Sequence, residues 1–412
     1  MRRLRYGITA IAFLFASHVY ADWDLSGQGK LLLSQNRYSL DDIAAVSTGE
    51  QVFNDTTLNA RLVAKNHWDR YDLDIHYQLG GMSGDSLSIP SSASLVSATS
   101  LPDDASRLFN LTQVFSNTSN SLWLHRLDRL NIGYAGDQLV WRVGRQAVSW
   151  GNGLVFQPMD IFNPFAPLSI DTDYKPGDDL LYMQWLFANS DDLQMIYLPR
   201  RDSTTGELSA ARDSAAVKYH SQTAWGGWDL LLARHYDEDI VGLGHVQDVS
   251  GAVWRVDINH TRLNDGRDAI FAMTNMDYSW VWFNHNIYGF VEYYFNSLGA
   301  DYIDVTKIDQ ALLYRLERGE LFTLGRRELA TGMMVELSPR WRFNGTFVTN
   351  LHDKSSMLSV NASYDWLQDT KLMFGAQGGV GALDTEYGGL YSPPSGYLGL
   401  GNRFYLYIQQ YY

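Results

Sequence analysis

The sequence predicts an all-β fold, a single transmembrane antiparallel β-barrel of the up-and-down type. Three observations support this prediction. Apolar and polar residues alternate with a period of two along most of the 412 residues, as in strands with one face toward lipid and one toward water. After residue 21, no stretch approaches the ~18 uncharged apolar residues of a membrane helix. Aromatic residues nevertheless make up 14% of the chain, which suits the aromatic girdles of such barrels.

The N-terminus has the three parts of a secretory signal. Arg2, Arg3 and Arg5 form a basic region, an apolar run follows, and Val19 and Ala21 stand at the −3 and −1 positions of a cleavage site. We therefore expect residues 1–21 to be a signal peptide and residues 22–412 to form the barrel as one domain. The alternative is a retained N-terminal anchor, which the small residue at the cleavage site disfavours.

The alternating segments run to about ten residues, the length that a tilted strand needs to cross a bilayer. For example, residues 71–79 read YDLDIHYQL and residues 254–259 read WRVDIN. A soluble sandwich also alternates, but its segments are shorter and its apolar faces need a partner sheet. The length of the segments therefore favours the barrel.

Short and long connections alternate along the chain, which indicates short periplasmic turns and long external loops. The long connections are residues 38–54, 80–119, 151–178, 299–322 and 384–396. With both termini on the periplasmic side, the number of strands must be even. We predict 18 strands if residues 240–249 form a strand that turns at Ser250 and Gly251, and 16 strands otherwise.

The stretch from Leu139 to Asp179 is the most informative, because it begins as an alternating strand and continues into a long connection. Long loops without helical periodicity are usually functional or disordered, and this one is too apolar for disorder because it holds Phe156, Ile161, Phe162 and Phe165. We expect the loop of residues 151–178 to fold into the lumen and constrict it. The residues expected at the constriction are Arg142, Arg145, Gln146, Trp150, Asp160, Asn163, Asp171, Asp173 and Lys175.

Arg145 needs its own explanation, because strict alternation from Leu139 points it at lipid. A cation near the bilayer midplane costs about 2–4 kcal/mol. We expect a β-bulge at Gly144 that turns Arg145 inward, so that Arg145 and Gln146 hold the loop by hydrogen bonds to Asp160 or to loop carbonyls. The alternative is that the strand has already left the bilayer at this point.

The predicted inward faces carry charges of both signs. The residues expected in the lumen are Arg61, Asp72, Asp74, Lys218, Arg255, Asp257, Glu292 and Arg342. Wide barrels select solutes by such side chains and by an inserted loop, so opposed charges across a constriction are one interpretation. The other is that these charges pair across the wall and fill the lumen, since a polar interior is required of the fold in any case.

Composition and motifs exclude several other functions. The formal net charge of −14 argues against nucleic acid as a partner. The chain has no cysteine, so it has no disulfide and no thiolate metal site. We find no HExxH or GxSxG pattern, and the acidic ends of the long loop match no EF-hand. We therefore expect no catalytic residues, no metal and no cofactor.

The last residues alternate up to an aromatic C-terminus. Phe404, Leu406 and Ile408 share one face, and the chain ends on Tyr412. This pattern resembles the assembly signal of bacterial outer-membrane barrels and implies the barrel assembly machinery as a partner. Gln410 departs from it, since an apolar residue is usual at that position.

Residues 144–164 read GRQAVSWGNGLVFQPMDIFNP. The GRQ, SWG and DxFNP elements resemble those of a largely uncharacterised group of Gram-negative outer-membrane porin-like proteins, distantly similar to the alginate-export porins. The resemblance covers about 40 residues in motif. It implies an outer-membrane channel or export conduit, beside an inner-membrane exporter in some relatives, and does not identify the cargo.

The sequence thus predicts an outer-membrane, porin-like barrel that passes a small solute or an exported substance past the loop of residues 151–178. The first alternative is a plugged barrel that binds or anchors a surface molecule such as a polysaccharide. The second is a membrane-embedded hydrolase, which the absence of a nucleophile motif disfavours. The expected surroundings are outer-membrane lipid.

Overall fold

The computed structural model describes residues 23–89, 104–393 and 396–412, so the expected signal peptide lies outside the described residues. Within these ranges, no helix is long and apolar enough to cross a membrane. The strands of the main sheet are β1 (Trp23–Arg37), β2 (Val52–Trp68), β3 (Tyr71–Gly84), β4 (Thr112–Thr118), β5 (Ser121–Ala135), β6 (Leu139–Gln146), β7 (Asp178–Leu186), β8 (Asp192–Leu198), β9 (Ser214–Thr223), β10 (Gly226–His235), β11 (Glu238–Val249), β12 (Ala252–Arg262), β13 (Asp268–Trp282), β14 (His285–Asn296), β15 (Arg327–Ser338), β16 (Trp341–Asn350), β17 (Ser356–Leu367), β18 (Thr370–Val380) and β21 (Asn402–Tyr411). The connections carry helices α1 (Ile43–Thr48) and α2 (Gln310–Glu317), the 3-10 turns η1 (Asp85–Ser88) and η3 (Val305–Lys307), and a small hairpin of β19 (Leu390–Ser392) and β20 (Gly396–Leu398).

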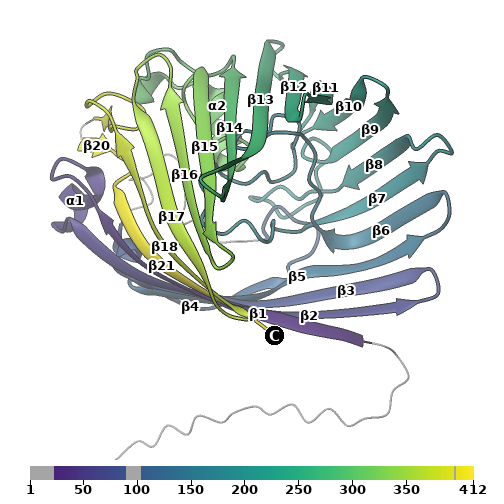
Figure 1. The fold of residues 1–412 in the computed structure, drawn as a ribbon, viewed down its shortest axis with the longest axis horizontal. Helices are drawn as coiled ribbons and strands as arrows, with labels where there is room; N and C mark the ends of the chain where they lie inside the picture. The colour runs from purple at the N-terminus through teal and green to yellow at the C-terminus, as the bar shows by residue number, and fades with distance from the viewer. Residues whose placement is uncertain (1–22, 90–103, 394–395) are drawn as a thin grey trace, which may run out of the picture.

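The barrel closes where the first and last strands pair. In Figure 1, β1 in purple lies beside β21 in yellow, and the two are antiparallel, with Leu31 opposite Ile408. Closure leaves no edge of unpaired backbone groups for the bilayer to meet. Apart from β4 and the small β19–β20 hairpin, the strands pair with their neighbours in chain order, so the fold is an up-and-down barrel as predicted.

The barrel has 18 strands around its wall, although 19 strands belong to the sheet. The difference is β4, which pairs with the same edge of β5 as β6 does, but with residues 121–126 rather than 130–135. The expected strand at residues 240–249 is part of β11, and it turns into β12 at Ser250 and Gly251, both with positive φ. The prediction of 18 strands is confirmed.

Short turns and both described chain ends gather at one end of the barrel, and the long connections lie at the other. Three connections at the long-loop end are nevertheless short. They are the two-residue turn at Tyr236 and Asp237, with φ of 50° and 66°, and the connections at residues 263–267 and 351–355. Paired positive φ values suit the right-handed twist of a hairpin.

The outward faces are apolar and end in stacked aromatic side chains near the short turns. Trp68, Tyr71, Tyr134 and Trp141 form one such group, with Tyr134 and Trp141 stacked at 6.1 Å between ring centroids. Such rows suit the membrane interface. Two clusters of buried apolar residues, by contrast, lie on inward faces and on the connection after β6. Two smaller clusters lie around α2 and the neighbouring connections.

Candidate functional site

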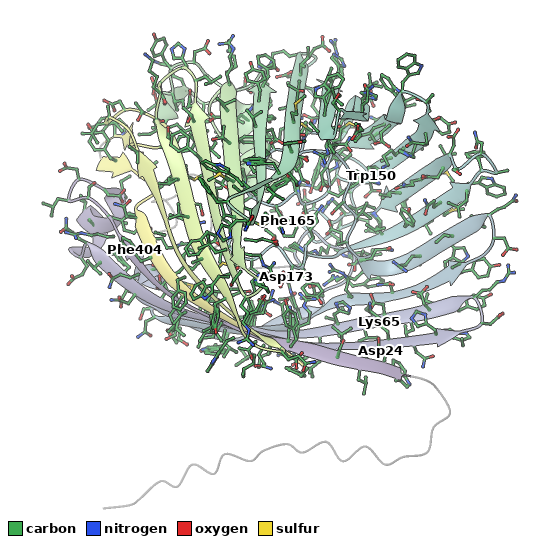
Figure 2. The ribbon with its side chains drawn as sticks, in the orientation of Figure 1. Asp24, Lys65, Trp150, Phe165, Asp173 and Phe404 are labelled. Carbon is green, nitrogen blue, oxygen red and sulfur yellow. The ribbon has the colours of Figure 1, made fainter. Side chains whose placement is uncertain are left out.

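Residues 147–177, here called the inserted segment, connect β6 to β7 and lie inside the ring of strands (Figure 2). Their first part packs against the inward faces of β7 to β11. Trp150, Met159 and Phe162 form one buried cluster with Leu180 of β7 and Leu231 of β10. Burying such side chains stabilises this arrangement by about 1.5–3 kcal/mol for each large residue.

Between Trp150 and Met159, the inserted segment crosses to β13–β16. Val155 and Phe156 are buried there with Met273 and Tyr294. The rings of Phe156 and Tyr294 stack with centroids 4.5 Å apart and an interplanar angle of 8°. The inserted segment is therefore bound to two separate parts of the wall.

Two fully buried carboxylates of the wall fix this part of the inserted segment. Glu292 of β14 accepts backbone N–H bonds from Leu154, Val155 and Phe156 at 2.7, 3.0 and 2.7 Å. Asp257 of β12 accepts the backbone N–H and the side-chain amide of Asn152, both at 2.7 Å. Both were expected to be lumen charges. In the structure, both carboxylates accept hydrogen bonds from N–H groups of the inserted segment, which would otherwise lack an acceptor.

The second half of the inserted segment reaches the opposite wall. Lys30 of β1 pairs with Asp171 at 2.7 Å and with Asp173 at 2.8 Å, and Gln409 of β21 donates to Asp173. The ring of Tyr174 lies 4.1 Å from the guanidinium of Arg61 on β2. Gln377 of β18 donates to the Leu168 carbonyl at 2.7 Å. The side chains of Asp171 and Asp173 stay 37% and 40% exposed, so they face open space beside the wall.

A buried ion pair closes the neck of the inserted segment. Lys175 donates to Asp160 at 2.6 Å and to the Val148 carbonyl at 2.8 Å, and Asn163 donates to Asp178 at 2.8 Å. Burial raises the pKa of Asp160 to about 6, although the Lys175 ammonium acts to lower it. Burial lowers the pKa of Lys175, against the opposing effect of Asp160.

The expectation for Arg145 is partly wrong. The ladders of β6 with β5 and β7 run in continuous register through Gly144, so there is no bulge there. The bulge lies in β5 at Asp128, where the register with β3 shifts between His76 and Tyr77. Gly144 instead adopts φ +118°, a conformation that strains residues with side chains.

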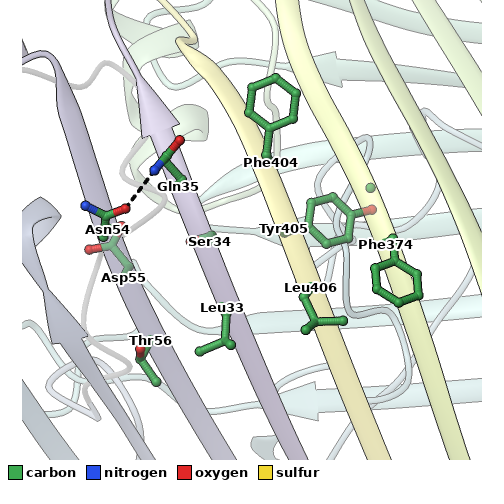
Figure 3. Close-up of a pocket in the computed structure, with 11 residues that line it drawn as sticks. Leu33, Ser34, Gln35, Asn54, Asp55, Thr56, Phe374, Phe404, Tyr405 and Leu406 are labelled. Atoms are coloured by element: carbon green, nitrogen blue, oxygen red, sulfur yellow. Dashed lines mark hydrogen bonds between the residues drawn. The ribbon is translucent and has the colours of Figure 1, made fainter.

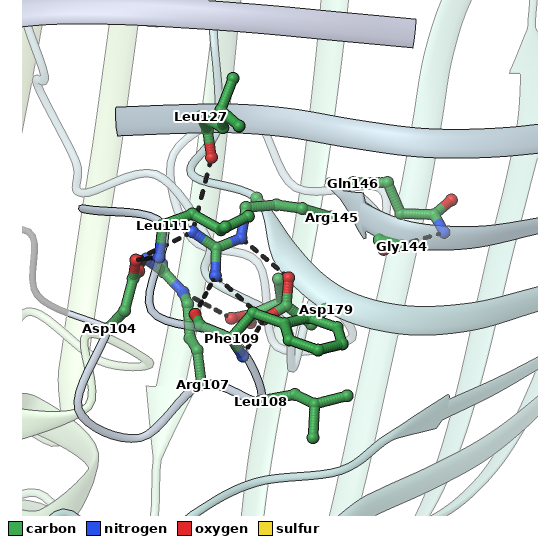
Figure 4. Close-up of polar contacts among 12 residues, drawn as sticks. Asp104, Arg107, Leu108, Phe109, Leu111, Leu127, Gly144, Arg145, Gln146 and Asp179 are labelled. Carbon is green, nitrogen blue, oxygen red and sulfur yellow. Dashed lines mark hydrogen bonds and ion pairs between the residues drawn. The ribbon is translucent and has the colours of Figure 1, made fainter. Parts of the chain in front are cut away.

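Arg145 is 2% exposed and holds a different loop from the one expected (Figure 4). Its guanidinium donates to Asp179 at 2.8 Å, to Asp104 at 3.0 Å and to the Phe109 carbonyl at 2.7 Å. Gln146 donates to the carbonyls of Arg142 and Leu180 rather than to the inserted segment. Arg145 contacts this loop because of the course of the chain. β6 ends at Gln146, and beyond that point residues 104–118, rather than the inserted segment, lie along β5.

Most of the other expected lumen charges pair with an ionisable side chain of the wall. Arg142 pairs with Asp72 at 3.3 Å and Arg342 with Asp365 at 3.0 Å. The remaining pairs are Arg61 with Asp128, Asp74 with His76, Lys218 with Asp229, and Arg255 with Asp277. Several of these side chains remain partly exposed, including Arg142 at 42% and Arg342 at 39%.

The sequence analysis missed Lys30, Gln377 and Gln409, which hold the far side of the inserted segment. The alternation of polar and apolar residues indicates that they lie on the inward face. It does not indicate their partners, which are more than a hundred residues away in the sequence. It also missed Asp104, for which no local pattern gives a signal.

A hydrogen-bonded chain of Ser214, His235 and Glu320 looks like a hydrolytic triad. The Ser214 hydroxyl lies 2.7 Å from His235 Nδ1, and Glu320 lies 2.9 Å from His235 Nε2. Ser214 is 1% and His235 3% exposed, and Phe162 packs on the imidazole ring. A nucleophile must reach its substrate, so we interpret the hydrogen bonds among Ser214, His235 and Glu320 as structural contacts. Among the described residues, no group of three or more His, Asp or Glu side chains is placed to hold a metal ion.

A groove of about 490 Å³ lies between β1, β2, β18 and β21 (Figure 3). Leu33, Phe374 and Phe404 line it, and each alternates with the residues that touch the inserted segment, Lys30, Gln377 and Gln409. The groove is therefore on the outer face of the wall, away from the inserted segment.

No protein-family model and no curated protein sequence matches the chain. Solved structures do match it over nearly its full length. OccK5 (OpdH) of Pseudomonas aeruginosa has a TM-score of 0.55 at 10% identity, and OccAB2 of Acinetobacter baumannii has 0.53 at 11%. A BenF-like porin from Pseudomonas fluorescens has 0.51 at 10%. Each alignment covers 95% of this chain and 98% of the other.

The chain has the porin fold. At such low identity the likeness concerns the fold alone, and the inserted segment and its anchors are described from this chain's own contacts.

Proposed function

We propose that the chain is an outer-membrane porin that passes a small polar solute around the inserted segment, which narrows the lumen. A closed wall of 18 strands is wide enough to leave an aqueous path when its interior is not filled by side chains. The likeness to a protein named a porin supports the same function.

One observation carries this proposal: the inserted segment is anchored to two opposite parts of the barrel wall. Glu292 and Asp257 hold it on one side, and Lys30 holds it on the other. A segment fixed in this way keeps its shape while solute passes, as a selective constriction requires. Asp171 and Asp173 are the half-exposed charges that a solute would meet at this level.

Recordings from planar lipid bilayers test the proposal. The purified, folded protein should give discrete conductance steps that scale with protein addition. Heat-denatured protein from the same preparation is the control. Silence from well-folded protein would refute the channel.

A second candidate function is a plugged barrel that binds or anchors a surface molecule. The two apolar clusters of the inserted segment and the paired lumen charges favour it, since both fill space inside the wall. This function predicts no conductance together with binding of a polysaccharide or another surface polymer, so the same recordings separate the two.

The surroundings follow from the same proposal. We infer export by the N-terminal signal, insertion by the barrel assembly machinery through the C-terminal strand, and residence in outer-membrane lipid. Because the motif of residues 144–164 resembles that of proteins thought to work beside an inner-membrane exporter, we also propose such an exporter as a partner. Pull-down with a tagged chain tests both protein partners.

A further inference from the structure

Two glutamates from distant parts of the chain meet at the first residues of β15, at the end of the barrel where the long connections lie. Glu328 belongs to β15 and is fully buried, and Glu386 lies in the 381–401 connection. A Cβ added at Gly325 would lie 2.3 Å from Glu328 Oε1 and 2.6 Å from Glu386 Oε2. Both carboxylates therefore converge on one point, and a side chain at residue 325 would displace them.

The pair has hydrogen-bond donors, but no Lys, Arg or His in the described part of the chain forms an ion pair with either carboxylate. Glu386 accepts the Leu324 N–H at 2.6 Å, the Gly325 N–H at 3.2 Å and the Asn350 amide at 2.8 Å. Glu328 Oε2 accepts the Tyr387 hydroxyl at 3.1 Å.

The other oxygen of Glu328 has no donor among the described residues, although it is buried. The charged groups that act on Glu328 are the carboxylates of Glu386 and Asp353, and Asp353 itself accepts the Glu386 N–H at 2.7 Å. Tyr294 of β14 and Tyr387 are the tyrosines that face the pair.

Two carboxylates that meet in a largely buried site, with no ion-pair partner among the described residues, cannot both be ionised at ordinary cost. A proton between them turns repulsion into a short O–H···O bond and gives the unpartnered Glu328 oxygen a role. Burial raises the pKa of Glu386, although its hydrogen bonds, including the one with Glu328, act to lower it.

We propose that Glu328 and Glu386 form a proton-binding site, in which one shared proton latches residues 381–393 to the barrel wall. Losing the proton leaves two negative charges in contact and releases Glu386 and its neighbours in this range from the wall. The latch is closed at acidic and neutral pH and opens as the pH rises.

The latch is joined to the inserted segment. Tyr387, next to Glu386, is buried in the same cluster as Val155 and Phe156. Leu390 packs with Leu312 of α2 in the neighbouring connection. Opening of the latch therefore removes a contact from the inserted segment, and an effect on conductance rests on the proposed channel function.

The test uses a spin label, because the chain has no native cysteine. A nitroxide is attached to a single cysteine at Leu383, which is 52% exposed and close to the latch in sequence. We expect its mobility to rise on alkaline titration, with a midpoint above neutral pH and therefore more than ~2 pH units above the ~4.3 of an ordinary glutamate. An unchanged spectrum from about pH 5 to about pH 10 would overturn the proposal.

Glu328→Gln in the labelled protein separates a shared proton from general unfolding. The glutamine amide donates to Glu386 as the protonated acid does, so the label should stay immobile and lose its pH dependence. Glu336→Gln is the matched control, because Glu336 lies on the same strand, is only partly buried, and accepts from Asn286. The same titration in Glu328→Gln as in the parent would overturn the proposal.

Chelation by EDTA tests a bridging cation. If EDTA mobilises the label at neutral pH and Ca²⁺ restores it, a cation and not a proton joins the carboxylates, and the proposal fails. The label reports on the latch whether or not the barrel conducts. A titrating label in a silent protein would therefore refute the channel and keep the latch.

Discussion

The carboxylate of Glu292 accepts a 2.7 Å hydrogen bond from the backbone N–H of Phe156, although 136 residues separate them. The same carboxylate also holds the N–H groups of Leu154 and Val155. An acidic residue on the inward face of a strand thus acts as an anchor for irregular backbone inside the barrel. Such anchors hold the inserted segment in the lumen.

Glu292→Ala should loosen the inserted segment without unfolding the wall. The substitution leaves three buried N–H groups without their acceptor, at about 1–3 kcal/mol for each unsatisfied group. Hydrogen exchange at residues 154–156 should accelerate at least tenfold. Glu336→Ala, on the next strand and half-buried, is the control and should leave these amides protected; equal protection in both variants would contradict the anchoring role.

Arg145→Ala should destabilise the whole barrel. It leaves Asp179 buried without a cationic partner and removes one of the two guanidinium groups, those of Arg145 and Arg107, that pair with Asp104, which costs about 3–5 kcal/mol. Arg142→Ala removes a guanidinium that is 42% exposed and 3.3 Å from Asp72, and such pairs contribute below ~1 kcal/mol. Urea unfolding in lipid vesicles measures both, and similar losses in the two variants would disprove the role assigned to Arg145.

The neck of the inserted segment should respond to acid through Asp160. Its pKa is raised to about 6 by burial, so the folded protein binds this proton at a higher pH than the unfolded chain, with its ordinary ~3.9. The contribution of Asp160 to the free energy of unfolding is therefore fully present below about pH 4 and is lost as the pH rises through about 6. The stability of wild type minus that of Asp160→Asn should fall across this window; a constant difference would contradict the assignment.

Charge reversal at Arg342 should change ion selectivity. Arg342→Glu puts a carboxylate beside Asp365 on an inward face where both side chains are more than a third exposed. The reversal potential in a KCl gradient should then move toward that of a cation-selective channel. Arg340→Glu, in the exposed turn between β15 and β16, is the control, and an equal shift in both would show that Arg342 does not line the path.

The wall of the barrel could be predicted from the sequence because alternation is local information. Residues 240–249 alternate clearly enough to establish the strand that makes the number even. The apolar residues of the inserted segment likewise predicted that it folds back inside. Each inference needed only neighbours in the chain.

The partners inside the barrel could not be predicted in this way. Alternation marks Glu292 and Asp257 as inward acids, but it cannot show that buried N–H groups rather than solute meet them. The same limit explains the error at Arg145, whose partner Asp104 arrives from a loop that continues the wall beside β5. Such contacts depend on where a whole loop folds, and no short pattern encodes that.

Deletion of the inserted segment tests whether this segment lies in the path of ions through the barrel. A variant in which residues 151–175 are replaced by a short Gly-Ser linker is compared with wild type in planar bilayers, after its folding is verified by heat-modifiable migration in SDS gels. The account predicts a larger single-channel conductance and weaker ion selectivity in the folded deletion variant. Equal conductance in the two proteins would contradict it, because the segment would then not lie in the path of ions.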